Sequence, residues 1–332
     1  MATYSTIKGF TIQSLSSDPP APQEGQVWYN TASTVLKGYG LSVPGGAWSA
    51  GNTMNTGRAY GGGAGATIDT SLAFGGSTPG GNTVNNESYN GTVWAEENNL
   101  VDALQGQMAA GTQTSAFSTA GKSPGQTTNS ELWDGTSWTE EADCNTARNL
   151  GGGAGTSTAA VIFSGGVWNE PAKHKLTELW NGTSWTEVGN LVDAHMTNVG
   201  SFGLSSTACM CVSGYTYPPG APDVTTFVEE WNGTSWTEKT AVPTGAHYMV
   251  GNGSVSSGFM AGGQTPANIA NTQFWNGSAW SELADLPIAI AAGTASQNSP
   301  SSQGLYAGGS PGPDTSSNEW TTGNAIKTFT AS

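Results

Sequence analysis

Glu131-Leu-Trp-Asp-Gly-Thr-Ser-Trp-Thr-Glu140 returns almost unchanged as Glu178-Leu-Trp-Asn-Gly-Thr-Ser-Trp-Thr-Glu187. A third copy is Glu230-Trp-Asn-Gly-Thr-Ser-Trp-Thr-Glu238, and weaker copies lie at 89–94 and 275–280. The second tryptophan of each copy and one orphan recur about every 44–51 residues, the interval of four-stranded propeller blades, at Trp48, Trp94, Trp138, Trp185, Trp236 and Trp280.

A second marker repeats with the same period. It is a short apolar run that ends in glycine, at Leu72–Gly76, Phe117–Gly121, Val161–Gly166, Cys211–Gly214, Phe259–Gly263 and Leu305–Gly309. Two markers that stay in phase predict an all-β, six-bladed β-propeller with four strands in each blade.

The order of the markers predicts how each blade is built. Trp-Asn-Gly-Thr-Ser-Trp indicates a hairpin of the two outer strands, with an Asn-Gly turn suited to positive φ at both turn positions. Glycine-rich segments such as Gly151–Gly155 suit the innermost strand, where blades crowd together.

Ring closure is predicted from what the last repeat lacks. Asn318-Glu-Trp320 has no second tryptophan, and Trp48 has no inner strands before it. We expect the segment near Ala47–Ser49 to supply the outer strand of the last blade, with Ala325–Thr330 as the alternative. The expected domains are a 1–40 attachment and closure segment and a 41–332 propeller.

Composition excludes several classes of protein. The net charge is −15 and Arg58 and Arg148 are the chain's two arginines, so binding to nucleic acid or to an anionic membrane surface is not expected. No apolar run approaches 18 residues and no signal peptide is visible at the N-terminus, so we expect a protein made in the cytoplasm without membrane insertion. Cys144, Cys209 and Cys211 are interpreted as small buried hydrophobic residues.

The glycine-terminated runs, each followed by an aromatic residue and a tryptophan, resemble the kelch family over residues 41–332. That resemblance implies a propeller and leaves function open, because kelch-like propellers include binding scaffolds and oxidases. Lys122 and Tyr215 replace the second glycine in two repeats, so we expect a differently shaped corner there.

The N-terminal segment differs from the repeats. After the proline-rich stretch 18–22, residues 26–37 are predicted to form another hairpin. The pattern Gly25-Gln-Val-Trp-Tyr-Asn-Thr31 resembles a segment of bacteriophage tail-fibre and other structural proteins. The resemblance implies a virion component.

Known propeller chemistries fit the sequence poorly. A sialidase site needs several arginines, and a copper oxidase site needs two histidines, two tyrosines and a cysteine that cannot be placed together here. We therefore expect no cofactor, no metal and no enzymatic activity, although a glycosidase pair of carboxylates stays open. The glutamates after the second tryptophans recur with the blade and are interpreted as solvated outer-strand charges, at Glu140, Glu187, Glu238 and Glu282.

Two groups of residues are candidates for binding. The positions 10 or 11 residues after each second tryptophan begin the innermost strand and predict a partial cationic ring at the channel mouth, at Arg58, Leu104, Arg148, His195, His247 and Ile290. The alternative is that these side chains bond to backbone of neighbouring blades. The variable loops Ser77–Glu87, Val167–Thr177 and Tyr215–Phe227 present the second group, Trp168, Lys173, His174, Lys175, Tyr215 and Tyr217, or serve only as connections.

The expected function is that of a non-enzymatic phage structural protein of the tail or fibre, located in the virion. One propeller face would bind a host-surface glycan or another virion protein, and oligomeric assembly on the particle is expected. The alternatives are a capsid decoration protein of the same fold and a carbohydrate-active enzyme.

Overall fold

The computed structural model describes residues 12–21, 26–166, 171–193, 199–215, 224–312 and 314–329. Contacts divide the chain into a first unit, Met1–Gly46 with Thr322–Ser332, and a second unit, Ala47–Thr321. The sequence had suggested a boundary at residue 40 and a C-terminus within the propeller. The described residues form an all-β, propeller-like fold whose eight sheets include five antiparallel sheets of four strands each.

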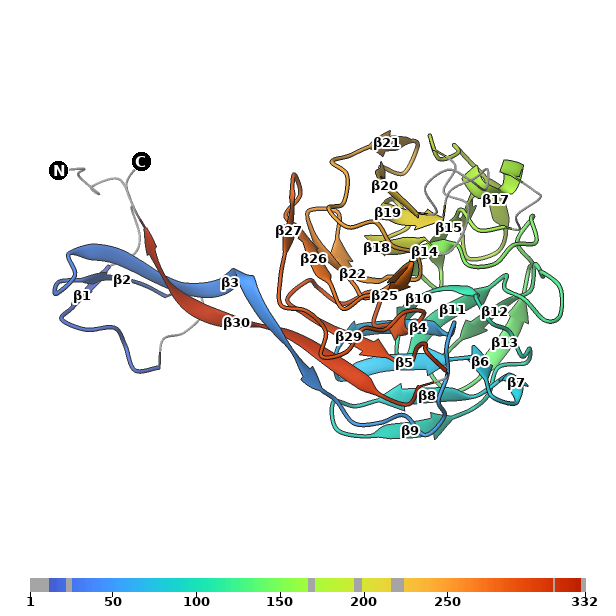
Figure 1. Cartoon of the computed structure of the whole chain (residues 1–332), viewed down its shortest axis with the longest axis horizontal. Helices are drawn as coiled ribbons and strands as arrows, with labels where there is room; N and C mark the ends of the chain where they lie inside the picture. Colours follow the sequence, from blue (N-terminus) through green and yellow to red (C-terminus); the bar gives the residue numbers. More distant parts are fainter. Residues whose placement is uncertain are drawn as a thin grey trace. The chain divides into compact units, whose positions relative to one another are not determined.

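The five four-stranded sheets follow one another along the chain (Figure 1). Sheet 1 is β4 (Gly62–Thr67), β5 (Thr70–Phe74), β8 (Asn86–Tyr89) and β9 (Trp94–Glu97). Sheet 2 is β10 (Met108–Thr112), β11 (Ser115–Thr119), β12 (Ser130–Trp133) and β13 (Trp138–Glu141). Sheet 3 is β14 (Gly152–Thr156), β15 (Ala159–Phe163), β16 (Thr177–Trp180) and β17 (Trp185–Glu187).

Sheet 4 is β18 (Gly200–Ser205), β19 (Ala208–Tyr215), β20 (Val224–Trp231) and β21 (Trp236–Glu238). Sheet 5 is β22 (Val250–Ser254), β23 (Ser257–Ala261), β26 (Thr272–Trp275) and β27 (Trp280–Glu282). Small hairpins, β6 (Ser77–Thr78) with β7 (Gly81–Asn82) and β24 (Gln264–Thr265) with β25 (Ala267–Asn268), lie in two connections. A further connection holds the 3₁₀ turn η1 (Pro171–Lys175).

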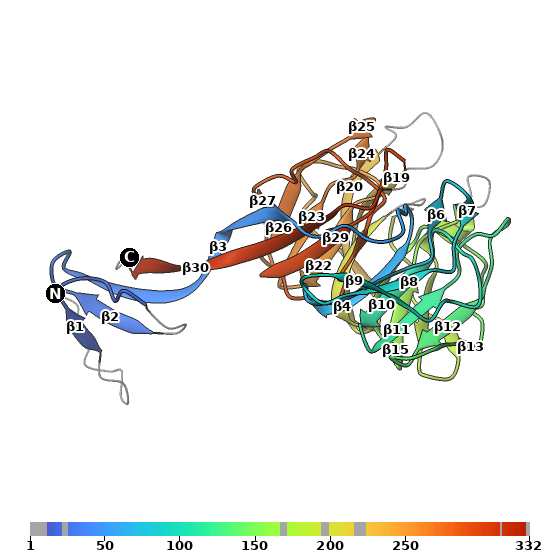
Figure 2. The ribbon, with the colours of Figure 1, turned by 90° about the horizontal axis from the view of Figure 1, so that it is seen from below.

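Sheet 6 draws on both ends of the second unit. It contains β28 (Thr294–Ala295), β29 (Gln303–Ala307), the start of β30 (Ser317–Phe329) and the end of β3 (Val35–Ala50). The Ser49 hydroxyl donates to the Glu319 carbonyl, and the Gly51 amide donates to Ser317 at 2.9 Å. The end of β3 runs beside β30 in both views of the ribbon (Figures 1 and 2).

The innermost strands pack closely against one another. Contacts join β4 to β10, β10 to β14, β14 to β18, β18 to β22, β22 to β28 and β28 to β4. A Cβ atom added at Gly63 in β4 would lie 2.0 Å from the Thr294 hydroxyl in β28, so no side chain fits there. Such crowding explains the glycine and alanine of these strands.

The hairpin turns differ from the sequence interpretation. Trp180 pairs with Trp185 across a four-residue connection, in which Gly182 has φ of +92° and the Asn before it is not left-handed. The Asn181 side chain accepts from the amides of Thr183 and Ser184, both at 2.9 Å. The expectation of positive φ at both positions was therefore wrong, because the asparagine acts as a side-chain acceptor rather than as a left-handed residue.

The repeated tryptophans pack in pairs and against the preceding sheet. The ring centroids of Trp231 and Trp236 lie 5.4 Å apart, and that of Trp236 lies 4.8 Å from the ring centroid of Phe163 in sheet 3. Trp48 has the same surroundings: it lies 5.5 Å from Trp320 and 5.9 Å from Phe259 of sheet 5. The indole N–H of Trp48 donates to the Thr272 hydroxyl, and the indole N–H of Trp236 donates in the same way to the Thr177 hydroxyl. Trp48 thus has the contacts of the second tryptophan that the last repeat lacks.

The first unit contains the predicted N-terminal hairpin. β2 (Val27–Asn30) pairs antiparallel with β3, which confirms the hairpin expected over residues 26–37, and β1 (Gln13–Leu15) pairs parallel with β2. The Asp18 carboxylate accepts from Trp28 Nε1 at 3.1 Å, Asn30 Nδ2 at 2.7 Å and Lys37 Nζ at 2.8 Å. These bonds, above all that from Lys37, hold the pKa of Asp18 below its usual value.

Trp48→Ala should lower the free energy of unfolding of the second unit by about 2–4 kcal/mol, because a half-buried indole leaves a cavity between two sheets. Urea unfolding of the full chain measures this. Trp280→Ala, at the matching place in sheet 5, is the control and should cost a similar amount. A stable Trp48→Ala variant beside a destabilised Trp280→Ala variant would contradict an outer-strand role for residues 47–50.

The three bonds to Asp18 should make the first unit sensitive to acid. A carboxylate with a lowered folded pKa contributes stability above its unfolded pKa of about 3.9 and loses it as pH falls through the folded value. The indole N–H resonance of Trp28 should therefore stay constant from pH 7 to about pH 4 and shift only below that. Asp18→Ala should shift it at every pH. A transition centred well above pH 4 in the parent chain would contradict this assignment.

Candidate functional site

A buried polar side chain recurs two residues before the first aromatic residue of each outer hairpin. Glu87 shows its role: its carboxylate accepts from the backbone amides of Asn55 at 2.7 Å and Thr56 at 3.0 Å, just before the innermost strand. Equivalent bonds are made by Glu131, Glu178, Glu229 and Gln273. We call these five residues the loop anchors, because each ties its third strand to the connection that enters its sheet.

The two arginines belong to this anchoring. Arg148 Nη2 donates to Glu178 at 2.9 Å and Arg148 Nη1 donates to the Leu176 carbonyl at 2.9 Å. Arg58 forms the same pair with Glu87 and donates to the Asn85 carbonyl at 2.7 Å. Both guanidinium groups are fully buried, and burial lowers their pKa against the opposing effect of the carboxylates. They bond within their own sheets and present no surface to a ligand.

In sheet 5, the position predicted for the cationic ring is also wrong by one residue. The backbone of His247 pairs with Gln264, as Ala59 pairs with Ser77, Gln105 with Lys122 and Ala291 with Ser310. His247 is therefore equivalent to the residue after Arg58, not to Arg58 itself, because the connection before it is one residue longer. His195 lies outside the described residues.

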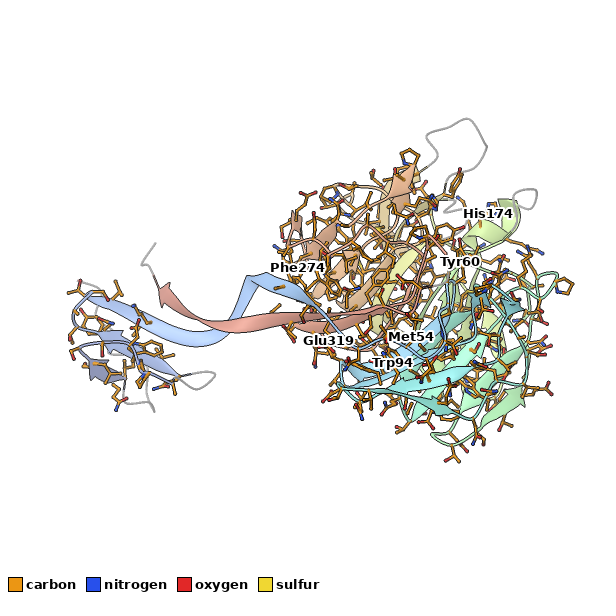
Figure 3. All side chains as sticks on the ribbon, turned by 60° about the horizontal axis from the view of Figure 1, so that its bottom comes forward. Met54, Tyr60, Trp94, His174, Phe274 and Glu319 are labelled. Atoms are coloured by element: carbon orange, nitrogen blue, oxygen red, sulfur yellow. The ribbon has the colours of Figure 1, made fainter. Side chains whose placement is uncertain are left out.

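Of the binding candidates predicted on the variable loops, Tyr215 lies close to another candidate, His247. Trp168 and Tyr217 lie outside the described residues, while Lys173 Nζ donates to the Ala147 carbonyl at 3.3 Å and His174 is buried in η1 (Figure 3). The ring centroid of His247 lies 5.1 Å from that of Tyr215 and 4.7 Å from that of Tyr248. Tyr215 is the last residue of a long β19 and pairs with Val224 of β20. The connection at Tyr215 therefore has a different shape from those of the other repeats, as predicted.

Backbone hydrogen bonds link five of the described residues that lie just before the innermost strands. Tyr60 N donates to Ala292 O at 2.8 Å, Gly106 N to Tyr60 O at 2.8 Å and Leu150 N to Gly106 O at 2.7 Å. Ala292 N donates to Tyr248 O at 3.1 Å. These five residues, the channel belt, all have left-handed φ between +57° and +66°.

Tyr60 and Tyr248 occupy belt positions at which glycine would adopt the left-handed backbone with less strain. The left-handed conformation costs a side-chain-bearing residue about 1–2 kcal/mol, and Gly106 shows that glycine fits the belt. Tyr60 and Tyr248 keep their rings nevertheless, half-buried and 5.1 Å apart in an edge-to-face contact. Figure 3 shows Tyr60 toward the middle of the sheets. Strain of this kind is retained mostly at functional sites.

The two tyrosines line two neighbouring hollows. The inner hollow has a volume of about 90 Å³, and the outer one, of about 180 Å³, reaches Gln105, Lys122 and Asn149. Both are lined by Tyr60, Gly106, Leu150 and Tyr248, which therefore form the constriction between them. Sequence reasoning missed both tyrosines, although each lies two residues before the innermost strand of its repeat.

The described part of the chain has no cluster of side chains suited to a metal ion. No group of three histidine, cysteine or acidic side chains lies close enough to hold a metal ion. The three cysteines are free and buried, as predicted, and burial raises the pKa of each thiol. No described helix has the length and apolar character needed to cross a bilayer.

The anchors should respond differently to the same substitution. Glu178→Gln should lower the free energy of unfolding at pH 7 by about 3–5 kcal/mol, because it leaves Arg148 buried without its counter-charge. Glu131→Gln is the matched control. Leu104 stands there instead of arginine, and Gln273 shows that an amide makes the same bond to a loop amide. We expect a change within about 1 kcal/mol in urea unfolding.

The pH dependence of Glu131 has the opposite sign to that of Asp18. Burial raises the pKa of Glu131, only partly offset by its two backbone bonds. The folded state therefore holds the proton more tightly, and stability falls as pH rises from the unfolded pKa to the raised folded value. Glu131→Gln should remove this slope, which begins at about pH 4.5, the ordinary pKa of a glutamate. A slope unchanged by the substitution would contradict this assignment.

Comparison with known proteins adds no relative: a scan against protein-family models and a search of curated proteins both find no match to this chain.

Proposed function

We propose that the second unit is a six-bladed, kelch-like propeller closed by residues 47–50, and that its channel-belt face is a recognition surface. The innermost strands contact one another in succession from β4 to β28, and β28 contacts β4. Trp48 repeats beside Trp320 the contacts that Trp280 makes beside Trp275. Both observations support a ring whose last outer strand comes from the N-terminal side of the chain.

The observation that carries the recognition role is the pair of strained tyrosines. Tyr60 and Tyr248 hold half-exposed rings at positions where the backbone favours glycine, beside Tyr215 and His247. Rigid aromatic rings with a hydroxyl are suited to gripping a ligand that has both apolar faces and hydrogen-bonding groups. A sugar ring is such a ligand.

The carboxylates favour binding over hydrolysis. Glu87, Glu131, Glu178 and Glu229 are used to anchor loops inside their sheets. They are related by the repeat, whereas glycoside hydrolysis needs two carboxyl groups on either side of one bond. The protein is accordingly a non-enzymatic structural component with a binding face.

The virion role rests on the resemblance of residues 25–31 to phage structural proteins. The first unit forms its own hairpin, tied by Asp18, and is distinct by its contacts from the second unit. This division suits a protein that attaches to a particle through one unit and presents the other. The partners are then other virion proteins, especially those of the tail or fibre, and a host-surface glycan.

A glycan array tests the recognition role. The full chain should bind a subset of surface glycans, and the Tyr60→Ala/Tyr248→Ala double variant should lose at least tenfold in affinity, because aromatic anchors dominate binding energy. Lys239→Ala, whose side chain pairs with Glu230 on an outer strand, is the control and should bind as the parent does. A double variant that binds as well as the control would contradict a site at the belt.

Immunogold electron microscopy tests the virion role. An antibody to the second unit should label phage particles whose genome encodes this chain, at the tail or its fibres. Label over the capsid instead would favour decoration, and unlabelled intact particles would contradict an exposed virion role.

A further inference from the structure

The inner hollow of the channel has a polar floor made of unpartnered oxygen atoms. Gln107 Nε2 donates to the Phe74 carbonyl at 3.1 Å, which fixes the amide so that Oε1 is the atom left without a partner. The hydroxyl of Thr294 and Oε1 of Gln297 also lack partners. Gln107 and Thr294 are 7% and 5% exposed, so these oxygens are withdrawn from bulk water.

A loop crosses the channel at the same end. Residues 296–302 connect β28 to β29, where each of sheets 1 to 5 has a turn of two residues. Asn298 N donates to the Gly65 carbonyl of β4 at 3.1 Å and Asn298 Nδ2 donates to the Gly155 carbonyl of β14 at 2.8 Å. Because β10 lies between β4 and β14, Asn298 reaches across this end of the channel, and we expect a ligand to enter from the side of the tyrosines.

We propose that this channel is an end-on site for the terminal residue of a neutral glycan, whose ring lies against Tyr60 and Tyr248 and whose exocyclic group enters the inner hollow. The proposal rests on the recognition role proposed above and names its ligand more closely. Hydroxyl or amide donors of the sugar would meet the acceptors Gln107 Oε1, Thr294 Oγ1 and Gln297 Oε1.

Size and charge define the ligand class. Even together, the two hollows fall below the roughly 300–1,000 Å³ of pockets for drug-sized ligands, so they suit one sugar unit. A channel that a loop crosses at one end suits a chain end better than the interior of a chain, which must leave in two directions. The described residues of the inner hollow carry no formal charge, so a sugar carboxylate would lack a counter-ion there.

The test uses the full chain and a panel of methyl glycosides of neutral hexoses and N-acetylhexosamines, observed by saturation-transfer NMR. A glycan array presents the same sugars as chain ends and within longer chains. At least one methyl glycoside should bind and compete with glycans that carry the same sugar at the end. Thr294→Val should weaken that binding about three- to tenfold by removing one hydrogen-bonding group.

The belt tyrosines give the second readout. Tyr60→Gly and Tyr248→Gly should each weaken binding at least tenfold while the variants unfold cooperatively in urea, because glycine suits the left-handed backbone. Ala120→Gly relieves a left-handed alanine, φ +58°, just after β11 and should keep the parent affinity.

The outcomes separate this inference from the proposed function. Equal binding of chain ends and chain interiors, or unchanged affinity in Thr294→Val and both tyrosine variants, would overturn the end-on site and leave glycan recognition standing. Failure of every glycan on the array to bind would overturn the recognition role and, with it, this site.

Discussion

The close approach of the innermost strands is the constraint on which the structure depends. β4, β10, β14, β18, β22 and β28 contact one another, and at Gly63 even a methyl group would collide with β28. Small residues are therefore required along these strands, and the backbone just before them turns left-handed to form the channel belt. Four of the five belt residues carry a side chain in this conformation, and the two largest, Tyr60 and Tyr248, attract a functional interpretation.

The loop anchors solve a second problem created by this arrangement. The connections that enter sheets 1 to 5 carry backbone amides that need partners, and a glutamate or glutamine of the third strand accepts from them. In sheets 1 and 3 an arginine pairs with the buried carboxylate. In sheet 2, where Leu104 stands in place of the arginine, burial raises the pKa of Glu131. Charges that look available for binding in the sequence are in this way used for structure.

Periodicity made the strands predictable and left the site hidden. The Trp-Asn-Gly-Thr-Ser-Trp copies and glycine-terminated runs gave the four-stranded sheets and the place of Trp48, because each element repeats in phase. Arg58 and Arg148 were assigned to the channel mouth because spacing does not tell which way a side chain turns, and a one-residue difference moved His247 out of register. Tyr60 and Tyr248 were missed because positive φ at a tyrosine has no sequence signature.

The pairing of Ser49 with Glu319 joins residues that are 270 positions apart. At roughly 5–20 residues per second of synthesis, the early partner waits some tens of seconds for the late one. During that time the edge of the segment around Trp48 is open to strands of other nascent chains. The order of synthesis thus makes the last sheet the slowest to complete, and expression at lower chain density favours the monomeric product over exchange of this strand between copies.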